Sequence, residues 1–420
     1  MLKILVIGGG AREHTLAWKL RQSSRVAEVY VAPGNAGTGA IARNLDISPN
    51  DLDALSRAAK DHKFDLVVVG PEVPLAAGIV DILEGLGIPA FGPSREAALI
   101  ESSKVFAKKL MHKYGIPCAQ DEVFTSFDSA QDYVNKHRLP LVIKADGLAA
   151  GKGAIIAQST EEAVKALSDI MEARVFGDAG DQVLVEECLV GQETSLIAFT
   201  DGKTVVPMVP ARDYKRIYDH DLGPNTGGMG VYSPPGFFNR ELADTLTKTI
   251  LEPVVRAMAE EKKPYKGVLY AGLMLTSEGP KVLEFNARFG DPETQVQLPL
   301  LKSDLVDIIF SVIDGTLEHT KVEWSDGACV GVVMASGGYP DSYKVGFPIT
   351  GLDRVDSDIM VFHAGTVADG DKVSTSGGRV LTVTAMGGEV AEAREKVYHS
   401  VPFIQFEGCH YRKDIAVEER

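Results

Sequence analysis

Two lysines and three glycines stand close together in Leu141-Val-Ile-Lys-Ala-Asp-Gly-Leu-Ala-Ala-Gly-Lys-Gly153, and they could bind phosphate groups. Lys144 lies in an apolar run typical of a strand, and a lysine ammonium group acts as a point charge on phosphate. The glycines that follow allow a loop to fold its backbone N–H groups over the same phosphate. The segment is not a P-loop, because Gly153 stands where that motif needs Ser or Thr. A surface hairpin is the alternative interpretation.

Oxygen ligands for a metal ion occur in Val282-Leu-Glu-Phe-Asn-Ala-Arg-Phe-Gly-Asp-Pro-Glu293. Glu284 and Asn286 are two residues apart, so on a strand their side chains point to the same face. A carboxylate and an amide oxygen are hard ligands that suit Mg²⁺ bridging phosphates. Arg288 shares that face if the strand continues, and it could stabilise a developing acyl phosphate. A polar strand edge without a ligand is the alternative.

A glycine-rich turn follows the first apolar run, in Gly8-Gly-Gly-Ala-Arg-Glu-His14. Gly8 and Gly10 fit a dinucleotide-binding pattern, but Glu13 stands where the third glycine is needed. The turn therefore indicates either a phosphate site with Arg12 as its charge partner or a tight strand–helix turn without a ligand.

Two further segments carry charged groups that could meet a ligand. The strand-like run 183–187 ends in two glutamates, and these with Glu193 could accept hydrogen bonds from ribose hydroxyls; solvated acids at a strand end are the alternative. The basic cluster Arg212-Asp-Tyr-Lys-Arg216 precedes the glycine-rich Gly223–Gly230, which suits an anionic partner and a close backbone approach. A mobile surface loop would have the same composition.

Helices and strands must position these residues. In residues 1 to about 100, short apolar runs alternate with helical segments. This alternation predicts an open parallel α/β sheet covered on both faces, with functional loops at the carboxyl ends of its strands. The predicted strands are 3–7, 29–32, 66–70 and 89–92, and the predicted helices are 14–22 and 51–62.

The remaining residues predict two more units of mixed α+β structure. The boundaries are 1–101 for the N-terminal domain, 102–325 for a central domain with a mobile lid at about 120–190, and 326–420 for a small C-terminal domain. The central domain is predicted to contain a helix at 102–114, strands at 141–144 and 183–187, a strand pair at 268–275 and 281–285, and a long loop at 209–235. The C-terminal domain is predicted to contain strands at 328–335, 360–363, 367–368 and 379–385 and a helix at 389–400.

Composition excludes several classes of protein. The chain has 420 residues and a net charge of −15, which argues against a nucleic-acid binder. No apolar run approaches the ~20 residues of a membrane helix, and the first ten residues lack the pattern of a signal peptide, so we expect a cytoplasmic protein. The four cysteines form no C-x-x-C pair, which disfavours zinc and disulfide sites.

Taken together, these motifs resemble the ATP-grasp superfamily, in which two α+β subdomains clamp ATP, and more closely the phosphoribosylamine–glycine ligase family. The resemblance extends over nearly the whole chain. Its marks are Gly10–His14, Pro33–Gly37, Val69–Glu72, Phe91–Pro93, Ser103–Phe106, Lys144–Lys152, Gly223–Gly230, Leu283–Glu293, Ala335–Pro340 and Gly377–Arg379.

The resemblance implies a reaction between small molecules, with Mg²⁺ or Mn²⁺ as cofactor. The γ-phosphate of ATP passes to the carboxylate of glycine, and the amine of 5-phosphoribosylamine then attacks the glycyl phosphate. The products are glycinamide ribonucleotide, ADP and phosphate. The family also implies a monomer.

The resemblance further implies roles for residues at matching positions. The ATP-binding residues would be Lys104, Lys144, Gly147, Gly151, Lys152, Gly153, Glu187, Leu189 and Glu193. The metal ligands would be Glu284 and Asn286. The catalytic residues would be Arg288, Lys144 and Asp213. Asp213 and Lys215 would lie near glycine, and the phosphoribosylamine would be bound by Gly10, Arg12, Asn35 and Glu72.

Two positions depart from the family pattern, which has Gly at Ala11 and often His at Tyr214. Other functions also stay open. A sister ATP-grasp ligase, such as a purine carboxylase subunit or a peptide-bond ligase, would share the lysines and the Glu284/Asn286 pair. A nucleotide-binding regulator would have little use for a metal pair together with Arg288. An NAD-dependent dehydrogenase would rest on the first strand and its glycines alone.

Overall fold

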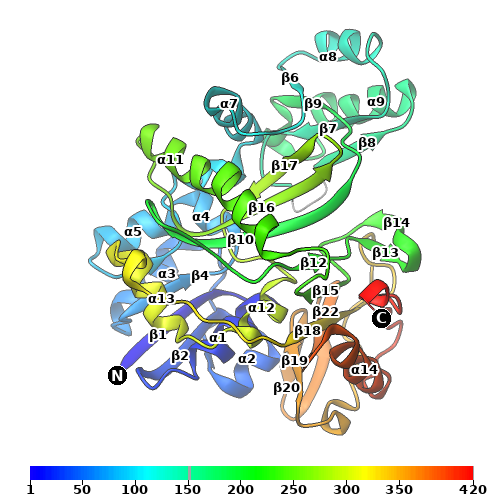
Figure 1. Ribbon diagram of the computed structural model, residues 1–420. Coiled ribbons are helices and arrows are strands. Elements are labelled where there is room, and N and C mark those ends of the chain that lie inside the picture. The colour runs from blue at the N-terminus through cyan, green and yellow to red at the C-terminus, as the bar shows by residue number, and fades with distance from the viewer. Residues whose placement is uncertain (150–152, 420) are drawn as a thin grey trace.

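The computed structural model describes residues 1–149 and 153–419. Its N-terminal part is an open parallel sheet of five strands in the order β3-β2-β1-β4-β5 (Figure 1). The parallel sheet predicted from the alternating pattern is therefore confirmed. The strands are β1 (Leu2–Gly8), β2 (Val26–Pro33), β3 (Arg43–Asn44), β4 (Leu66–Val69) and β5 (Ala90–Phe91).

Alternate residues of β1 pack into two different cores, which explains its unbroken apolar run. Ile4 and Val6 pack in one core with α1, whereas Leu5 and Ile7 pack in another with α3 and α5. Because successive side chains of a strand point to opposite faces, a strand covered on both sides needs an apolar residue at every position. The helices are α1 (Ala11–Leu20), α3 (Leu52–Asp61) and α5 (Ile79–Gly85).

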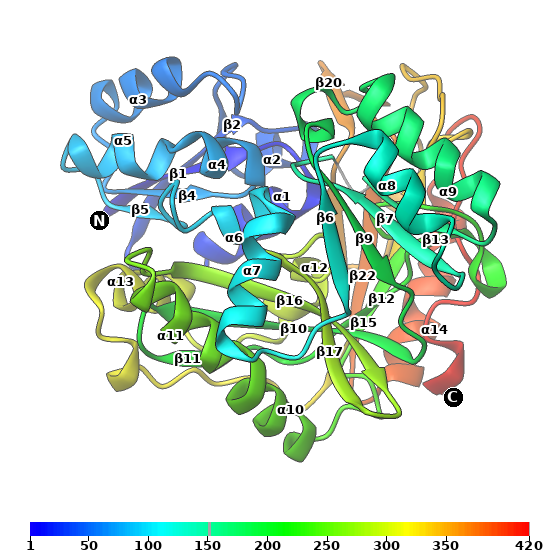
Figure 2. The ribbon, with the colours of Figure 1, turned by 90° about the horizontal axis from the view of Figure 1, so that it is seen from above.

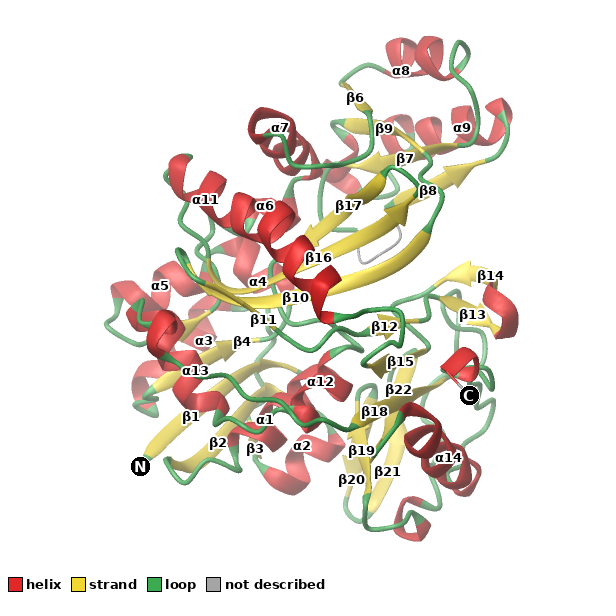
Figure 3. Ribbon diagram, in the orientation of Figure 1, coloured by secondary structure: helices red, strands yellow, loops and turns green. Residues whose placement is uncertain are grey.

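Two antiparallel sheets make up the middle of the chain (Figures 1 and 3). One has the order β11-β10-β16-β17 and includes the predicted strand pair, which is confirmed. The other has the order β6-β9-β7-β8 and carries α8 and α9 on its side away from β16 and β17. The elements are β6 (Asp121–Phe124), α8 (Phe127–Val134), β7 (Leu141–Ala145), β8 (Ala154–Ala157), α9 (Thr160–Leu167), β9 (Val183–Glu187), β10 (Gln192–Asp201), β11 (Val205–Pro207), β16 (Lys266–Thr276) and β17 (Gly279–Asn286).

The segment 209–235, which was expected to be one long loop, contains four short strands. Two of them join strands of the C-terminal part in a sheet of the order β12-β15-β18-β22-β19. Runs of two to four residues are too short to show periodicity, so the sequence did not reveal them. The strands are β12 (Arg212–Asp213), β13 (Arg216–Tyr218), β14 (Leu222–Asn225), β15 (Gly230–Ser233), β18 (Ala328–Ala335), β19 (Ile359–His363) and β22 (Arg379–Gly387), and α14 (Val390–Ser400) packs on the sheet.

Helix α12 (Thr294–Leu300) links the N-terminal and C-terminal parts. It contacts α1 on one side and β18 and β22 on the other, and the two views of the ribbon place it between these elements (Figures 1 and 2). The segment 287–293, which precedes α12, therefore lies where the N-terminal sheet, the central sheets and the C-terminal sheet come together.

The helix predicted at 102–114 begins two residues later, at Lys104, because Ser102 ends a separate short helix. α6 (Leu99–Ser102) ends at Ser103, whose extended backbone and side-chain hydrogen bond from the Phe106 N–H begin α7 (Lys104–Tyr114). This break places Lys104 in the first turn of a new helix. None of the helices in the described ranges is long and apolar enough to cross a membrane.

Glu13 fills the turn that follows β1. Its Oε2 accepts a hydrogen bond from the Gly10 N–H at 2.7 Å, and its Oε1 pairs with Arg12 Nε at 2.6 Å. A Cβ at Gly8 would lie 2.5 Å from the Glu13 side chain, and a Cβ at Gly70 would lie 2.0 Å from it. Because glycine has no side chain, Gly8 and Gly70 at these two strand ends leave room for the buried carboxylate of Glu13.

We expect Gly70→Ala to destabilise the N-terminal sheet by about 1–3 kcal/mol, as overpacking of a buried site does. Gly85→Ala, in α5, is the matched control, because nothing lies within 4 Å of its Cβ position. It should raise stability by at most about 1 kcal/mol, as alanine does in a helix. Scanning calorimetry of both variants measures the effect. Equal shifts of the unfolding temperature for the two variants would show that a side chain at position 70 does not clash with Glu13.

Candidate active site

Lys144 connects the β6–β9 sheet to β17. Its Nζ donates hydrogen bonds to Glu186 Oε2 at 2.8 Å and to the Leu283 carbonyl oxygen at 3.1 Å. Glu186 lies on the neighbouring strand β9, and both side chains are buried. The lysine thus joins the two central sheets at their junction.

Lys104, in the first turn of α7, contacts the loop that follows β7. Its Nζ donates to the Gly147 carbonyl oxygen at 2.9 Å. Burial lowers the pKa of Lys104, and the carboxylate of Glu284 opposes this shift. A Cβ at Gly147 would lie 2.6 Å from the Cβ of Ala179, so packing requires glycine there. The predicted ATP-binding residues Gly151 and Lys152 lie outside the described residues.

Glu187 and Leu189, also predicted to bind the nucleotide, lie at the end of β9 and on its connection to β10. Glu187 Oε1 accepts from the Gln120 N–H at 3.0 Å and from Lys281 Nζ at 3.3 Å. Glu187 therefore lies where the β6-β9-β7-β8 sheet meets the hairpin of β16 and β17. Leu189 is half-buried, and Gly153 is buried directly before β8.

Glu284 and Asn286 lie on the same face of β17, as predicted from their spacing. Gly272 is the register partner of Glu284, and a Cβ there would lie 3.4 Å from Glu284 Cγ. Burial would raise the pKa of Glu284, but Lys215 and three other cationic side chains hold it below its usual value. An ionised carboxylate beside an amide oxygen fits a hard divalent cation.

Asp213 and Lys215 form an acid–base pair next to Glu193. Burial would lower the pKa of Lys215, but Asp213 and Glu193 outweigh it and keep the pKa well above its usual value. Lys215 Nζ lies 3.0 Å from Glu193 Oε1. Burial also raises the pKa of Asp213 to about 7, against the opposing charge of Lys215. Near neutral pH this carboxyl group can therefore both hold and release a proton.

Arg288 pairs with two carboxylates of the N-terminal part. Its Nε lies 3.0 Å from Glu72 Oε2 and 3.5 Å from Glu101 Oε1. Burial would lower the pKa of Arg288, but Glu101 and Glu72 hold it above its usual value. Glu101 Oε2 also accepts from the Ala287 N–H at 2.6 Å, and burial raises the pKa of Glu101 to about 7.

The residues predicted to bind phosphoribosylamine gather around the turn after β1. Arg12 is buried between Glu13 and the Phe289 carbonyl oxygen, at 3.3 Å from the latter. Asn35 caps α2 (Ala36–Ile41) through the Thr38 N–H. Its Nδ2 donates at 3.0 Å to the Gly9 carbonyl oxygen and at 2.7 Å to the His363 carbonyl oxygen. The Asn35 amide therefore ties the turn to the C-terminal part.

Both departures from the family pattern have simple local explanations. Ala11 is the first residue of α1 and has helical neighbours, so its position does not require glycine. The Tyr214 hydroxyl donates to Glu418 Oε1 at 2.6 Å and accepts from the Ala416 N–H at 2.9 Å. Tyr214 packs in the core of the C-terminal part and not beside Glu193, where its neighbour Lys215 points.

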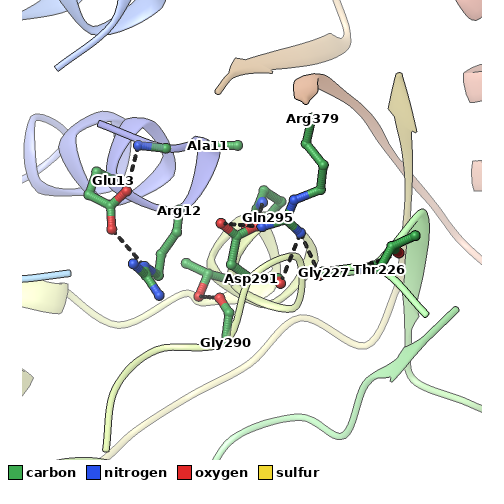
Figure 4. A network of polar contacts seen from close by, with 12 residues as sticks. Ala11, Arg12, Glu13, Thr226, Gly227, Gly290, Asp291, Gln295 and Arg379 are labelled. Carbon is green, nitrogen blue, oxygen red and sulfur yellow. Dashed lines mark hydrogen bonds and ion pairs between the residues drawn. The ribbon is translucent and has the colours of Figure 1, made fainter. Parts of the chain in front are cut away.

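Several residues of the cleft were not identified from the sequence as carrying a role. Glu186 was hidden by its neighbour Glu187, although strand alternation indicates that only one of the two faces inward. No local signal marks Glu101. The pairing of Asp291 with Arg379, whose Nη2 lies 3.0 Å from Asp291 Oδ2, joins distant segments (Figure 4).

His112, Cys118 and Asp121 form a group whose ligand-type atoms lie within 4.8 Å of one another. Lys108 Nζ lies 3.6 Å from Asp121 Oδ1 and already neutralises that carboxylate. Burial raises the pKa of the Cys118 thiol. A neutral thiol and a nearby ammonium group do not favour a metal ion.

Three family models match consecutive parts of the chain. They describe phosphoribosylglycinamide synthetase: its N domain matches residues 2–101, its ATP-grasp (A) domain residues 102–294, and its C domain residues 329–418.

Named relatives match over the same length. The phosphoribosylamine–glycine ligase of Halalkalibacterium halodurans is 52% identical over 423 residues, covering 100% of this chain and 98% of the relative. The crystal structure of the phosphoribosylamine–glycine ligase from Thermotoga maritima is 34% identical with a TM-score of 0.87, covering 99% of this chain and 100% of that one. A biotin carboxylase from Campylobacter jejuni shares the fold alone, with 13% identity, a TM-score of 0.76, and coverage of 98% and 93% of the two chains.

We expect Glu101→Gln to stabilise the protein increasingly as the pH rises from about 5 to about 8. Because the pKa of Glu101 is raised from 4.5 to about 7 in the folded protein, its contribution to stability is complete below pH 4.5 and is lost as the pH rises through 7. Glutamine cannot ionise, so this loss, at most about 3 kcal/mol, disappears.

Scanning calorimetry at four pH values measures this effect. Glu84→Gln, a change of an exposed glutamate on α5, is the control and should follow the wild-type profile. Parallel profiles for the wild type and the Glu101→Gln variant would contradict the expectation.

Proposed function

The chain belongs to the phosphoribosylglycinamide synthetase family, the ATP-grasp ligases of purine biosynthesis, and we propose that its cleft joins glycine to 5-phosphoribosylamine through a glycyl phosphate. The observation that carries the proposal is the convergence of Lys104, Lys144, Lys215 and Arg288 on Glu284. Four cations from separate segments around one carboxylate suit a site for phosphates and a metal ion.

In the first step a carboxylate oxygen of glycine attacks the γ-phosphorus of ATP, and the bond to ADP breaks. We assign the phosphate contacts to Lys104 and Lys144, with 147–153 as the loop over them, and the adenosine contacts to Glu187, Leu189 and Glu193. The hydrogen bonds of both lysines to groups around the β7 loop and β17 support this assignment. Closure of a loop would keep water from the acyl phosphate.

Glu284 and Asn286 would hold Mg²⁺ or Mn²⁺, which supplies positive charge to the phosphates when bound. The ionised state of Glu284 supports this role, because hard cations prefer anionic oxygen ligands. Both metals accept the same oxygen donors, so the donor set fits either of them.

In the second step the amine nitrogen attacks the carbonyl carbon of glycyl phosphate and phosphate leaves. Arg288 would stabilise the negative charge that develops there. Lys215 and Asp213 would contact glycine, and a pKa of about 7 suits Asp213 to accept the proton that the amine loses.

The phosphoribosylamine would lie at the turn after β1, with Gly10, Arg12 and Glu72 around it. Asn35 would shape this turn through its hydrogen bonds to neighbouring carbonyl groups. We propose functional units at 1–101, 102–325 and 326–420, with 120–190 as the lid. A monomeric state and a cytoplasmic location stay predictions from the sequence.

We expect ADP release only when ATP, Mg²⁺, glycine and phosphoribosylamine are all present. The amine is made in the assay from ribose 5-phosphate and ammonia, and each component is omitted in turn. A coupled spectrophotometric assay follows ADP. Release without glycine, or only with another carboxylate, would assign the protein to a sister ATP-grasp ligase.

We expect Lys144→Ala to lower kcat by about 100-fold or more, because a charged contact to the transferred phosphate contributes several kcal/mol in the transition state. Lys165→Ala is the control, since Lys165 lies on the same lid but is exposed and pairs only with Asp169. Steady-state kinetics and circular dichroism compare both variants with the wild type. Near wild-type turnover of Lys144→Ala in a folded protein would refute the assigned phosphate site.

A further inference from the structure

Two side chains of the C-terminal part bind the backbone of a single glycine, Gly227, of the segment 209–235. The Gly227 N–H donates to the Tyr339 hydroxyl at 3.0 Å, and Arg379 Nη1 donates to the Gly227 carbonyl oxygen at 2.6 Å. Both polar backbone groups of Gly227 are thus held by one domain. Tyr339 and Arg379 belong to the two C-terminal motifs for which the proposed reaction has no role.

The loop around this glycine packs closely against its neighbours. A Cβ at Gly227 would lie 3.1 Å from Arg379 Cζ, and a Cβ at Gly228 would lie 2.5 Å from Pro292 Cδ. Gly228 also has a φ of +110°, a conformation that L residues rarely adopt. The loop 226–229 is therefore fitted between the Arg379 guanidinium group and the turn that precedes α12.

Arg379 holds that turn as well. Its Nη2 lies 3.0 Å from Asp291 Oδ2, and its Nη1 donates to the Asp291 carbonyl oxygen at 3.1 Å. Gln295 Nε2 fixes the other carboxylate oxygen at 2.8 Å (Figure 4). Burial would raise the pKa of Asp291, but Arg379 and Arg12 hold it below its usual value, so the carboxylate stays charged.

Asp291 faces the turn proposed to bind phosphoribosylamine. Its Oδ2 lies 3.6 Å from the position that a Cβ of Gly10 would take. The close view places Arg12 between Glu13 and Asp291, with Arg379 on the opposite side of Asp291 (Figure 4). The guanidinium group of Arg379 therefore supports the carboxylate that faces Gly10.

The same loop also reaches the proposed glycine site. The Thr226 N–H and hydroxyl donate to the Lys215 carbonyl oxygen at 2.7 and 2.8 Å. The Gly228 N–H in turn donates to the Thr226 hydroxyl at 3.0 Å. A displacement of Gly227 would therefore move the backbone that carries Lys215.

We propose that Tyr339 and Arg379 are positioning residues for the ligation, which hold the loop 226–229 and Asp291 in place at the phosphoribosylamine side of the cleft. The inference rests on the proposed function, because the proposed function places phosphoribosylamine at the turn after β1. It gives the C-terminal domain a part in the reaction, although neither residue is assigned to ATP. Lys104 and Lys144 contact Gly147, Glu186 and Leu283, which do not belong to this arrangement.

The test compares Tyr339→Phe and Arg379→Lys with the wild type in steady-state kinetics, with each substrate varied in turn. Phenylalanine keeps the ring, which lies against Gly378, and removes only the acceptor of the Gly227 N–H. Lysine keeps the charge of Arg379 but cannot bind Gly227 and Asp291 together in the geometry of a guanidinium fork. Tyr343→Phe is the matched control, because Tyr343 is an exposed tyrosine next to Tyr339.

We expect the KM for phosphoribosylamine to rise about 3- to 10-fold in Tyr339→Phe, as for loss of one hydrogen bond. In Arg379→Lys we expect a rise of about 10- to 100-fold, as for a charged bidentate pair. The KM for ATP should stay within about twofold of wild type, and Tyr343→Phe should behave as wild type.

A role confined to holding the domains together predicts a different result. It would lower the unfolding temperature and the fraction of active protein, so kcat would fall while the KM for phosphoribosylamine stayed unchanged. That result, unchanged kinetics, or an equal rise of the KM values for both substrates would overturn the proposal. If Arg379→Lys does not fold, Tyr339→Phe decides. A failure of the proposed function is distinguishable, because the wild type would then release no ADP in the complete mixture.

Discussion

Arg288 is a half-buried guanidinium group whose charge is balanced by carboxylates from outside its own sheet. They come from Glu72, at the start of α4 (Glu72–Ala77), and from Glu101 on α6. Arg288 follows Asn286 by two residues, so the ion pairs hold the end of β17 against the N-terminal part. The relative placement of the metal-type ligands and the glycine-rich turn depends on this cluster.

Three of the cationic side chains proposed to bind substrates have carboxylate partners within the protein. Lys144 pairs with Glu186, Lys215 with Glu193, and Arg288 with Glu72. A cation that is already paired does not have to be taken out of water when an anionic substrate arrives. Binding therefore becomes an exchange of partners, and this explains how a chain with a net charge of −15 can hold a site for ATP.

The sequence predicted those features that local periodicity encodes. Apolar runs identified four of the five strands of the parallel sheet but not β3, which is Arg43–Asn44, and a spacing of two placed Glu284 and Asn286 on one face of β17. Contacts between distant segments left no such signal. Arg379 and Asp291 meet only because α12 packs against β22, and the strands of 209–235 are too short to recognise.

Glycine-rich segments show most clearly what cannot be predicted from the sequence. A glycine indicates that some group approaches the backbone closely, but it does not identify that group. Gly8 and Gly70 make room for the carboxylate of Glu13, which is a side chain of the protein and not a bound phosphate. Gly227 makes room for Arg379, and Gly230 for the side chain of Ile415, whose atoms would lie 2.5 Å from a Cβ there. Groups of the protein itself thus lie beside these four glycines, tightly at Gly8, Gly70 and Gly230 and with an approach of 3.1 Å at Gly227. A glycine motif is evidence for a phosphate site only when the group that fills the space has been identified, and here the lysines and the Glu284/Asn286 pair carry that argument.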